Sequence, residues 1–196
     1  YEKGKFDIAG FAVGIVGKNK ILSKDKIKNN DLILAIPSSG LHSNGYSLVR
    51  YLLKKKKINI KKNFFLKKEL IKPTKIYVNE VLKLIDKDLI NGCANITGGG
   101  LADNIKRVIP NNFSAEINLG KIKTSKIFRW LHKNGVSDRE MLKTLNCGVG
   151  FCLIVNPKKL NKIKRYFTNN FKPYVIGKIT KNFKEKVKLN GSVNWI

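Results

Sequence analysis

The chain has 196 residues, of which 42% are hydrophobic, so it can bury a core and form one domain, or one domain with a piece of another. Its formal net charge of +27 would suit nucleic acid, but only five of the 40 basic residues are arginine. The lysines are spread over nearly every segment, which favours a solvated basic surface over a nucleic-acid partner. No apolar run approaches the ~18 residues of a membrane span and no signal segment opens the chain, so we expect a soluble protein with no membrane partner.

The first thirty residues predict a β-hairpin followed by a linker. Apolar and small residues alternate from Asp7 to Val16, as in a strand that packs closely on both faces, and Ile21–Leu22 returns after a turn. Residues 23–30 are polar and lysine-rich, so a new unit begins at Asp31. Because the chain opens on Tyr1 and not on Met, we expect a fragment that lacks an N-terminal part.

A polar loop between an apolar strand and a helix is the most informative stretch. The run Leu32–Ile36 leads into Pro37–Arg50, which begins with Ser, Gly, His and Asn and then takes on helical apolar spacing. Backbone N–H groups at a helix N-terminus favour an anion, and phosphate is the obvious candidate, although the same residue types form ordinary turns and caps. His42 can also exchange a proton near neutral pH. The candidate binding residues here are Ser38, Ser39, Gly40, Ser43, Asn44 and Gly45.

A second strand–loop–helix unit follows. Pro73–Thr74 sets the start of a helix over Lys75–Asp86, and a short strand from Ala94 then runs into a threonine and three glycines before a helical stripe that ends at Pro110. Glycines let the backbone approach a ligand without a Cβ clash, although a flexible turn is the alternative. Two such units in one small domain predict a shared ligand cleft. The candidate residues are Thr97, Gly98, Gly99 and Gly100.

The last third alternates strands and helices. Polar and glycine residues stand at the mouth of the strand Phe151–Val155, where they commonly line a pocket, with a plain turn as the alternative; the candidates are Asn146, Cys147 and Gly148. The other predicted elements are a strand over Ser114–Leu119, helices over Ser125–Asn134, after Gly135–Asp138 and over Leu160–Phe171, and a strand over Tyr174–Ile179. This alternation predicts an α/β layered domain.

The cysteines and histidines form no legible metal site. Cys93, Cys147 and Cys152 lack CxxC spacing, and the chain has only two histidines, so no metal ligands are predicted in this chain. An odd number of cysteines suits a reducing compartment.

Several stretches, in the right order, together resemble one enzyme family, phosphoribosylformylglycinamidine cyclo-ligase, also called aminoimidazole ribonucleotide synthetase. They are Asp7–Gly14, Ser38–Arg50, Pro73–Tyr77, Ile96–Gly100 with Asn104–Ile105 and Arg107–Val108, and Asn146–Gly150. The resemblance covers essentially the whole chain, and the serine-histidine-asparagine stretch is its most specific part. The triple glycine is shared with relatives.

The resemblance implies a mixed sheet flanked by helices and a step of purine biosynthesis, in which formylglycinamidine ribonucleotide and ATP give aminoimidazole ribonucleotide, ADP and phosphate. The family is a cytoplasmic, Mg²⁺-using homodimeric ligase whose N-terminal domain supplies the dimer interface and most of the ATP site. Residues 1–30 then correspond to the closing strands of that domain and 31–196 to the C-terminal domain. We therefore expect the fragment to be inactive alone, with the metal ligands upstream.

Three positions depart from the family pattern: Asn95 replaces the usual His, Asp103 the usual Glu, and Lys143–Leu145 the usual Arg-Thr-Phe. The first puts a catalytic role there in doubt, because Asn cannot shuttle a proton. The alternatives are another ATP-dependent member of the superfamily, such as selenophosphate synthetase, thiamine-phosphate kinase, the hydrogenase maturation protein or formylglycinamidine ribonucleotide synthetase, or a lysine-rich nucleic-acid-binding module.

Overall fold

The computed structural model describes residues 4, 6, 8–181 and 184–195, and its centre is one mixed β-sheet of six strands in the order β2-β4-β1-β5-β3-β6. The β3–β6 pair is parallel and the other pairs are antiparallel. The strands are β1 Leu32–Pro37, β2 Gly92–Asn95, β3 Ser114–Asn118, β4 Val149–Val155, β5 Tyr174–Thr180 and β6 Val187–Asn190. The predicted α/β class and mixed sheet are confirmed.

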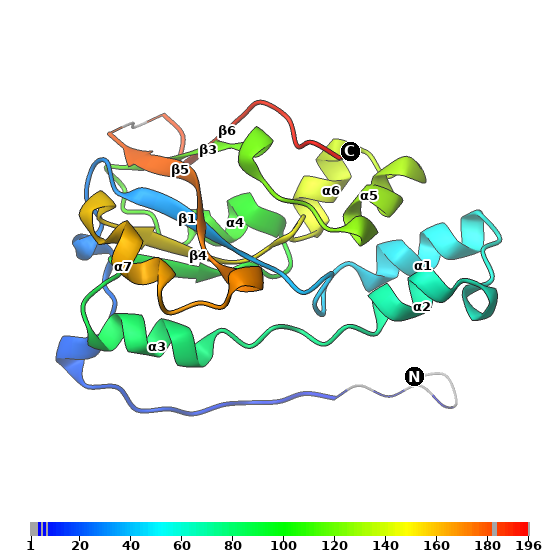
Figure 1. Ribbon diagram of the computed structural model, residues 1–196, viewed down its shortest axis with the longest axis horizontal. Helices are drawn as coiled ribbons and strands as arrows, with labels where there is room; N and C mark the ends of the chain where they lie inside the picture. Colours follow the sequence, from blue (N-terminus) through cyan, green and yellow to red (C-terminus); the bar gives the residue numbers. More distant parts are fainter. Residues whose placement is uncertain (1–3, 5, 7, 182–183, 196) are drawn as a thin grey trace.

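Helices cover both faces of this sheet (Figure 1). They are α1 Tyr46–Lys55, α2 Phe64–Leu70, α3 Val78–Asp86, α4 Gly100–Lys106, α5 Lys126–Lys133, α6 Asp138–Thr144 and α7 Leu160–Lys164. Along β1, Ile33 and Ala35 belong to the core under α1, α2, α4, α5 and α6, whereas Leu34 and Ile36 belong to the core under α3 and α7. This alternation is the period-two pattern of a strand that is buried on both sides.

The register of the sheet brings three loops to one edge. Pro37 at the end of β1 pairs with Val149 at the start of β4, and Asn95 at the end of β2 pairs with Phe151. The segments that follow β1 and β2 and the segment that precedes β4 therefore leave the sheet at the same end. These segments are the three stretches that the sequence singles out as candidate binding loops.

The predicted N-terminal hairpin is wrong for the described residues, which form no strand before β1; Asp7 lies outside them. The segment from residue 8 to 17 is extended but unpaired, and Phe11, Val13 and Ile15 are 98%, 99% and 102% exposed. A strand needs a neighbouring backbone to hydrogen-bond, and Figure 1 shows this segment running apart from the sheet on the side of α3. Strand-like alternation is present without a pairing partner.

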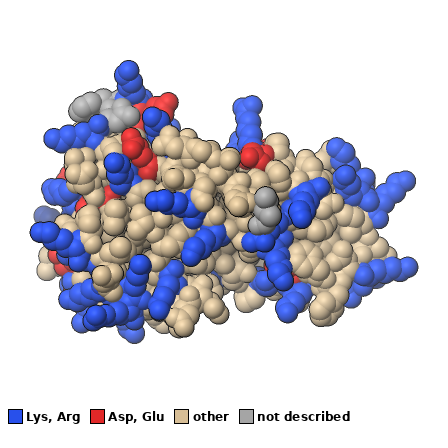
Figure 2. All heavy atoms as spheres, turned by 45° about the horizontal axis from the view of Figure 1, so that its top comes forward, with Lys and Arg blue, Asp and Glu red and all other residues tan. Residues whose placement is uncertain are grey.

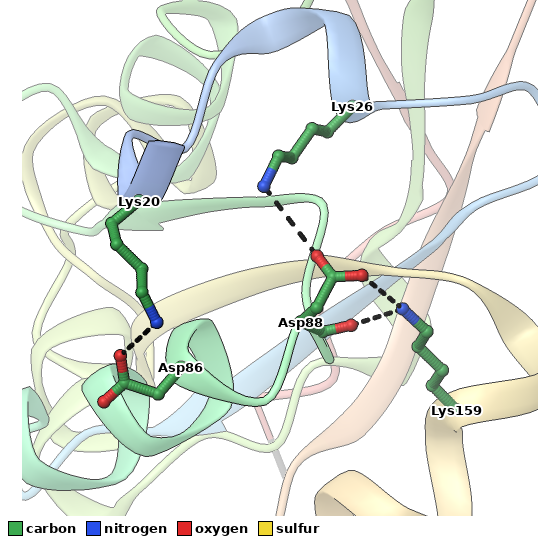
Figure 3. Close-up of polar contacts among 5 residues, drawn as sticks. All are labelled: Lys20, Lys26, Asp86, Asp88 and Lys159. Carbon is green, nitrogen blue, oxygen red and sulfur yellow. Dashed lines mark hydrogen bonds and ion pairs between the residues drawn. The ribbon is translucent and has the colours of Figure 1, made fainter. Parts of the chain in front are cut away.

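Ion pairs attach the next part of this segment to the domain (Figure 3). Two short 3-10 turns, η1 Lys18–Lys20 and η2 Lys24–Lys26, each provide one lysine. Lys20 Nζ lies 3.1 Å from Asp86 Oδ1, and Lys26 Nζ lies 3.8 Å from Asp88 Oδ1. Lys159 Nζ contacts the second oxygen of Asp88 at 3.5 Å and its backbone carbonyl. The predicted linker is thus held against the end of α3.

Two predicted helices are shorter than expected. The helix expected from Lys75 begins at Val78, because the preceding residues bond to the loop after β1 and form no helix. The helix expected over Leu160–Phe171 ends at Lys164, since Thr168 is extended before the 3-10 turn η6 Asn169–Phe171. Thr and Asn favour such local breaks. Helix α2 and strand β6 were not predicted.

Within the described residues, no helix is long and apolar enough to cross a membrane. Figure 2 shows Lys and Arg side chains scattered over the whole of the visible face, with few Asp and Glu between them. This distribution agrees with the solvated basic surface that the sequence predicts.

Candidate functional site

Hydrogen bonds join the loop after β1 to the turn before β4. The backbone N–H of Ser38 donates to Gly148 O at 2.9 Å, and Ser38 Oγ donates to Asn146 Oδ1 at 3.0 Å. Asn146 Nδ2 donates in turn to Gly40 O at 2.9 Å. One buried amide therefore connects both loops, which fixes their relative position.

The predicted Asn146–Gly148 stretch forms the buried floor of the site. Asn146 and Cys147 are each 2% exposed, and Gly148 N–H donates to Asn146 Oδ1 at 2.9 Å. Cys147 Sγ donates to Met141 O at 3.3 Å, and burial raises the pKa of its thiol to about 12. A protonated, bonded thiol is a poor nucleophile, so Cys147 has a packing role in this geometry.

A second buried amide organises the triple-glycine loop. Asn104 on α4 is 4% exposed, and its Nδ2 lies 3.3 Å from Thr97 O, 3.3 Å from Gly98 O and 2.7 Å from Gly100 O. Thr97 Oγ1 donates to Asn104 Oδ1 at 3.1 Å. Because these carbonyls turn inward, the loop keeps one conformation. Sequence reasoning gave Asn104 no role, since nothing in its local pattern shows that it faces the loop.

Glycine is required in this loop by contact and by conformation. A Cβ on Gly100 would lie 2.0 Å from Leu142 O, and Gly99 has φ +93°, where side chains are strained. Gly98 differs, since its Cβ would meet only Asn44 Oδ1, at 3.5 Å. Gly98 is exposed and has ordinary φ, so it is the glycine that leaves room above the loop.

The loop after β1 and the loop after β2 are neighbours, as the sequence predicts, because Asn44 Oδ1 would lie 3.5 Å from a Cβ on Gly98. Asn44 comes from the loop after β1 and Gly98 from the loop after β2, and Ser43 next to Asn44 is exposed. Gly45, with φ +81°, ends the first loop against Leu145, whose Cδ2 would lie 2.1 Å from an added Cβ. Contact of these residues with a ligand stays a prediction.

His42 lies beneath the loop and not in solvent. It is 6% exposed, has φ 58°, and its Nε2 accepts a hydrogen bond from the N–H of Ser39 at 3.2 Å. Burial lowers the pKa of His42 below the ordinary 6.5, so the ring is neutral at pH 7. With Nε2 accepting, the proton of the neutral ring is on Nδ1.

Tyr77 closes the underside of the same loop. Its hydroxyl donates to Pro37 O at 2.8 Å, and burial raises its pKa so that it remains a donor. Its ring centroid lies 6.1 Å from that of His42 and 5.3 Å from that of Phe151. Gly150 in β4 permits this arrangement, since a Cβ there would lie 2.0 Å from the Tyr77 hydroxyl.

The irregular segment before α3 completes the site and was missed by sequence reasoning, which assigned it to a helix start. Ser39 Oγ donates to Pro73 O at 2.6 Å, and Ser43 Oγ lies 3.1 Å from Thr74 Oγ1. These partners are more than thirty residues away in the chain, so no local signal showed this arrangement. A hollow of about 350 Å³ opens beside it, lined by Thr74, Lys75, Tyr77, Leu82, Asn95 and Phe151.

The chemistry of these residues suits binding more than proton transfer. Backbone N–H groups, hydroxyls and amides dominate, and within the described part of the chain no three His, Cys, Asp or Glu side chains gather as metal ligands. The described residues therefore offer no cluster of three protein ligands for a metal ion. Lys75 lines the hollow, with Nζ 3.0 Å from Glu80 Oε1, and His42 is the one imidazole in the site.

Residues 28–190 match the family model of the AIR synthase related protein, C-terminal domain. The chain is 42% identical over 185 residues to the chloroplastic/mitochondrial phosphoribosylformylglycinamidine cyclo-ligase of Vigna unguiculata, covering 91% of this chain and 48% of that protein. It is 43% identical over 183 residues to the phosphoribosylformylglycinamidine cyclo-ligase of Clostridium novyi, covering 91% and 54%. The chain thus spans about half the length of these curated relatives.

Solved structures share the fold at low identity. Thiamine-monophosphate kinase from Stenotrophomonas maltophilia aligns with a TM-score of 0.61 at 17% identity, over 91% of this chain and 56% of that one. PurL of T. maritima complexed with FGAR aligns with a TM-score of 0.52 at 11% identity, over 84% and 26%.

Proposed function

We propose, from the premise that this chain belongs to the AIR synthase related protein C-terminal domain family, that it is the C-terminal part of a phosphoribosylformylglycinamidine cyclo-ligase. Such a ligase uses ATP to close the imidazole ring of aminoimidazole ribonucleotide during purine biosynthesis. The identities of 42% and 43% to relatives of that name support the proposal. Because this chain spans about half of each, the activity of the whole protein is part of the proposal.

The observation that carries it is the meeting of two polar loops at Asn44 and Gly98, over a floor that Asn146 holds together. Both loops leave their strands at one edge of the sheet. Ring closure through a phosphorylated intermediate needs oriented donors for phosphate and for an amide-like substrate, and it needs water to be excluded. Rigid loops rich in N–H and hydroxyl groups meet the first requirement.

In this proposal the exposed edge formed by Ser43, Asn44 and Gly98 binds a phosphate or the formylamidine group, and Thr97 and the glycines form its wall. Asn146, Cys147 and Gly148 support the loop from below. His42 keeps the candidate role in proton transfer only through Nδ1, because Nε2 already accepts from Ser39. Asn95 can orient a substrate by hydrogen bonds but cannot carry a proton.

We also propose that residues 1–30 belong to a preceding domain and residues 31–196 to the C-terminal domain. The full exposure of Phe11, Val13 and Ile15 supports this division, since an alternating apolar strand needs a sheet to cover it. Ile27, at 2% exposure, marks where the chain joins the present core.

ATP enters the proposal through the family, and two structural neighbours are described as complexes of PurL and of AaThiL with AMPPCP. When bound, ATP would supply the phosphoryl group that activates the formyl oxygen. Since the described residues hold no cluster of three metal ligands, we assign no step to a metal in this part of the protein. Homodimerisation and a cytoplasmic location complete the proposal.

The test is Gly98→Ala in the complete protein, with KM measured separately for the ribonucleotide and for ATP. The added Cβ meets only Asn44 Oδ1 at 3.5 Å, so the fold should tolerate it. If a ligand oxygen approaches this backbone, KM for that ligand should rise about tenfold, the effect of losing one charge-assisted hydrogen bond. Gly120→Ala is the matched control. Its added Cβ also meets an asparagine side-chain oxygen, Asn118 Oδ1 at 3.2 Å, and Gly120 lies outside the site.

Each outcome has a distinct meaning. A rise for one substrate assigns the loop to that substrate. Unchanged KM values for both, with the same Tm as the control, would remove Gly98 from the binding site. An unaltered complete protein with no cyclo-ligase turnover would reject the function itself.

A further inference from the structure

The segment Val193–Trp195 is bound to the domain by contacts that no catalytic requirement explains. Trp195 is 7% exposed, and its Nε1 donates to Asp138 Oδ1 at 3.0 Å. The indole stacks on His132, with ring centroids 5.2 Å apart and an interplanar angle of 16°, and His132 Nε2 lies 2.8 Å from the same Asp138 oxygen. Val193, at 5% exposure, belongs to the larger core.

One connection from this segment reaches the underside of the site. Thr124 Oγ1 donates to Asn194 O at 3.3 Å. The backbone of Lys123 and Thr124 lies directly against Gly148, where an added Cβ would be 2.4 Å from Lys123 O and 3.2 Å from Thr124 Cα. Gly148 O accepts the N–H of Ser38. Thr124 therefore stands between the 193–195 segment and the loop after β1.

A second connection runs through α6. Asp138 is the first residue of α6, and the other end of that helix packs against both candidate loops. Leu142 O lies 2.0 Å from the position of a Cβ on Gly100, and Leu145 Cδ2 lies 2.1 Å from a Cβ on Gly45. Because neither glycine leaves room for one added carbon, the end of α6 and Leu145 pack directly against the two loops, and a shift of α6 has to move one loop or the other.

We propose that Trp195 and Thr124 are positioning residues, which hold the two loops of the site in register from a distance. The 193–195 segment fixes the 123–124 backbone next to Gly148 and the start of α6, so it supports the site through two separate connections. Neither residue touches the proposed ligand edge. The inference deepens the proposed function and rests on it only for its effect on turnover.

The first experiment needs no substrate. Amide hydrogen exchange is followed in the complete protein for Trp195→Phe, which keeps an aromatic ring but loses the indole N–H donor, and for Thr124→Val, which replaces the hydroxyl by a methyl group. The N–H groups of Ser38 and Gly148 should exchange about three- to tenfold faster in each variant, while the amides of β1 keep their rates. Trp130→Phe and Thr168→Val are the matched controls, outside both connections.

The second experiment measures coupling in kcat/KM between Thr124→Val and Ser38→Ala. Substitutions without shared partners combine independently, whereas a positioning role predicts a combined loss that departs from the product of the single losses by about threefold or more. Unchanged exchange at Ser38 and Gly148, or acceleration equal to that of β1, would overturn the inference. If the complete protein has no cyclo-ligase activity but the variants still accelerate exchange at Ser38 and Gly148 and not in β1, the proposed function is wrong and the positioning role stands.

Discussion

Gly150→Ala is the sharpest test of the packing beneath the site. The new Cβ would lie 2.0 Å from the Tyr77 hydroxyl, 2.9 Å from its Cζ and 2.6 Å from His42 Cε1. Gly150 lies in the interior strand β4, which cannot move without disturbing its two neighbours, β2 and β1. The substitution must therefore displace the Tyr77 ring, the His42 ring or both.

The magnitude follows from three contributions. Overpacking a core costs about 1–3 kcal/mol, and a displaced Tyr77 loses its hydrogen bond to Pro37 O, worth about 0.5–1.5 kcal/mol. Replacing a glycine of ordinary backbone conformation by alanine lowers the conformational entropy of the unfolded chain, which restores about 0.4–1 kcal/mol of stability. We expect Gly150→Ala to lower the free energy of unfolding by about 1–4 kcal/mol.

The assay is urea unfolding of the complete protein, with Gly98→Ala as the matched glycine substitution that meets no close atom. Adding Tyr77→Phe removes the atom at 2.0 Å, so the double variant should be more stable than the sum of the single effects predicts. Because displacement of His42 also frees the Ser39 N–H, KM should rise with the loss of stability. A Gly150→Ala variant as stable as the unaltered protein, or strict additivity with Tyr77→Phe, would refute this account of the packing.

Three further predictions use titration and charge. Since burial lowers the pKa of His42, the unfolded chain binds a proton near pH 6 that the folded chain does not, so the free energy of unfolding should fall as pH drops below 6.5. The fall should be measurably smaller in His42→Asn, and equal pH profiles of the two proteins would contradict this prediction. Cys147, with its pKa raised to about 12, should resist a disulfide reagent at pH 8 in the folded protein while the half-buried Cys93 is modified first; labelling of Cys147 before unfolding, read by mass, would refute its packing role. Asp88→Asn, which removes the pairs with Lys26 and Lys159, should cost less than about 1 kcal/mol and nothing in 1 M salt; a larger, salt-independent loss would show that the linker depends on more than these charges.

The elements most accurately predicted from the sequence are those specified by composition over several residues. The apolar runs at Leu32–Ile36 and Phe151–Val155 lie within the paired interior strands β1 and β4, because a strand buried on both faces must be continuously apolar. The sequence predicts that the glycines around residue 98 form a loop near the one that contains Asn44, and the structure places the two loops side by side, whereas ligand binding there stays a prediction.

The rest depends on partners that are distant in sequence. Alternation before residue 17 predicts a strand, but strand formation also needs a second backbone, which the described residues do not provide. Tyr77 and Asn104 stand in helix-like sequence and show their roles only through carbonyls at Pro37 and Gly98. His42 was predicted from its isolated position in a polar loop, but its burial could not be read there.

The inward turn of the loop carbonyls onto Asn104 and Asn146 has a consequence for how such a protein tolerates change. Since the carbonyls face inward, the backbone groups that face a ligand are mainly peptide N–H groups. A ligand bound by these N–H groups places little constraint on the neighbouring side chains. Alanine scanning of the outer face would then report on Ser43 and Asn44 but not on the peptide N–H groups beside them. Replacing single amide linkages by esters through chemical synthesis would test those N–H groups one at a time.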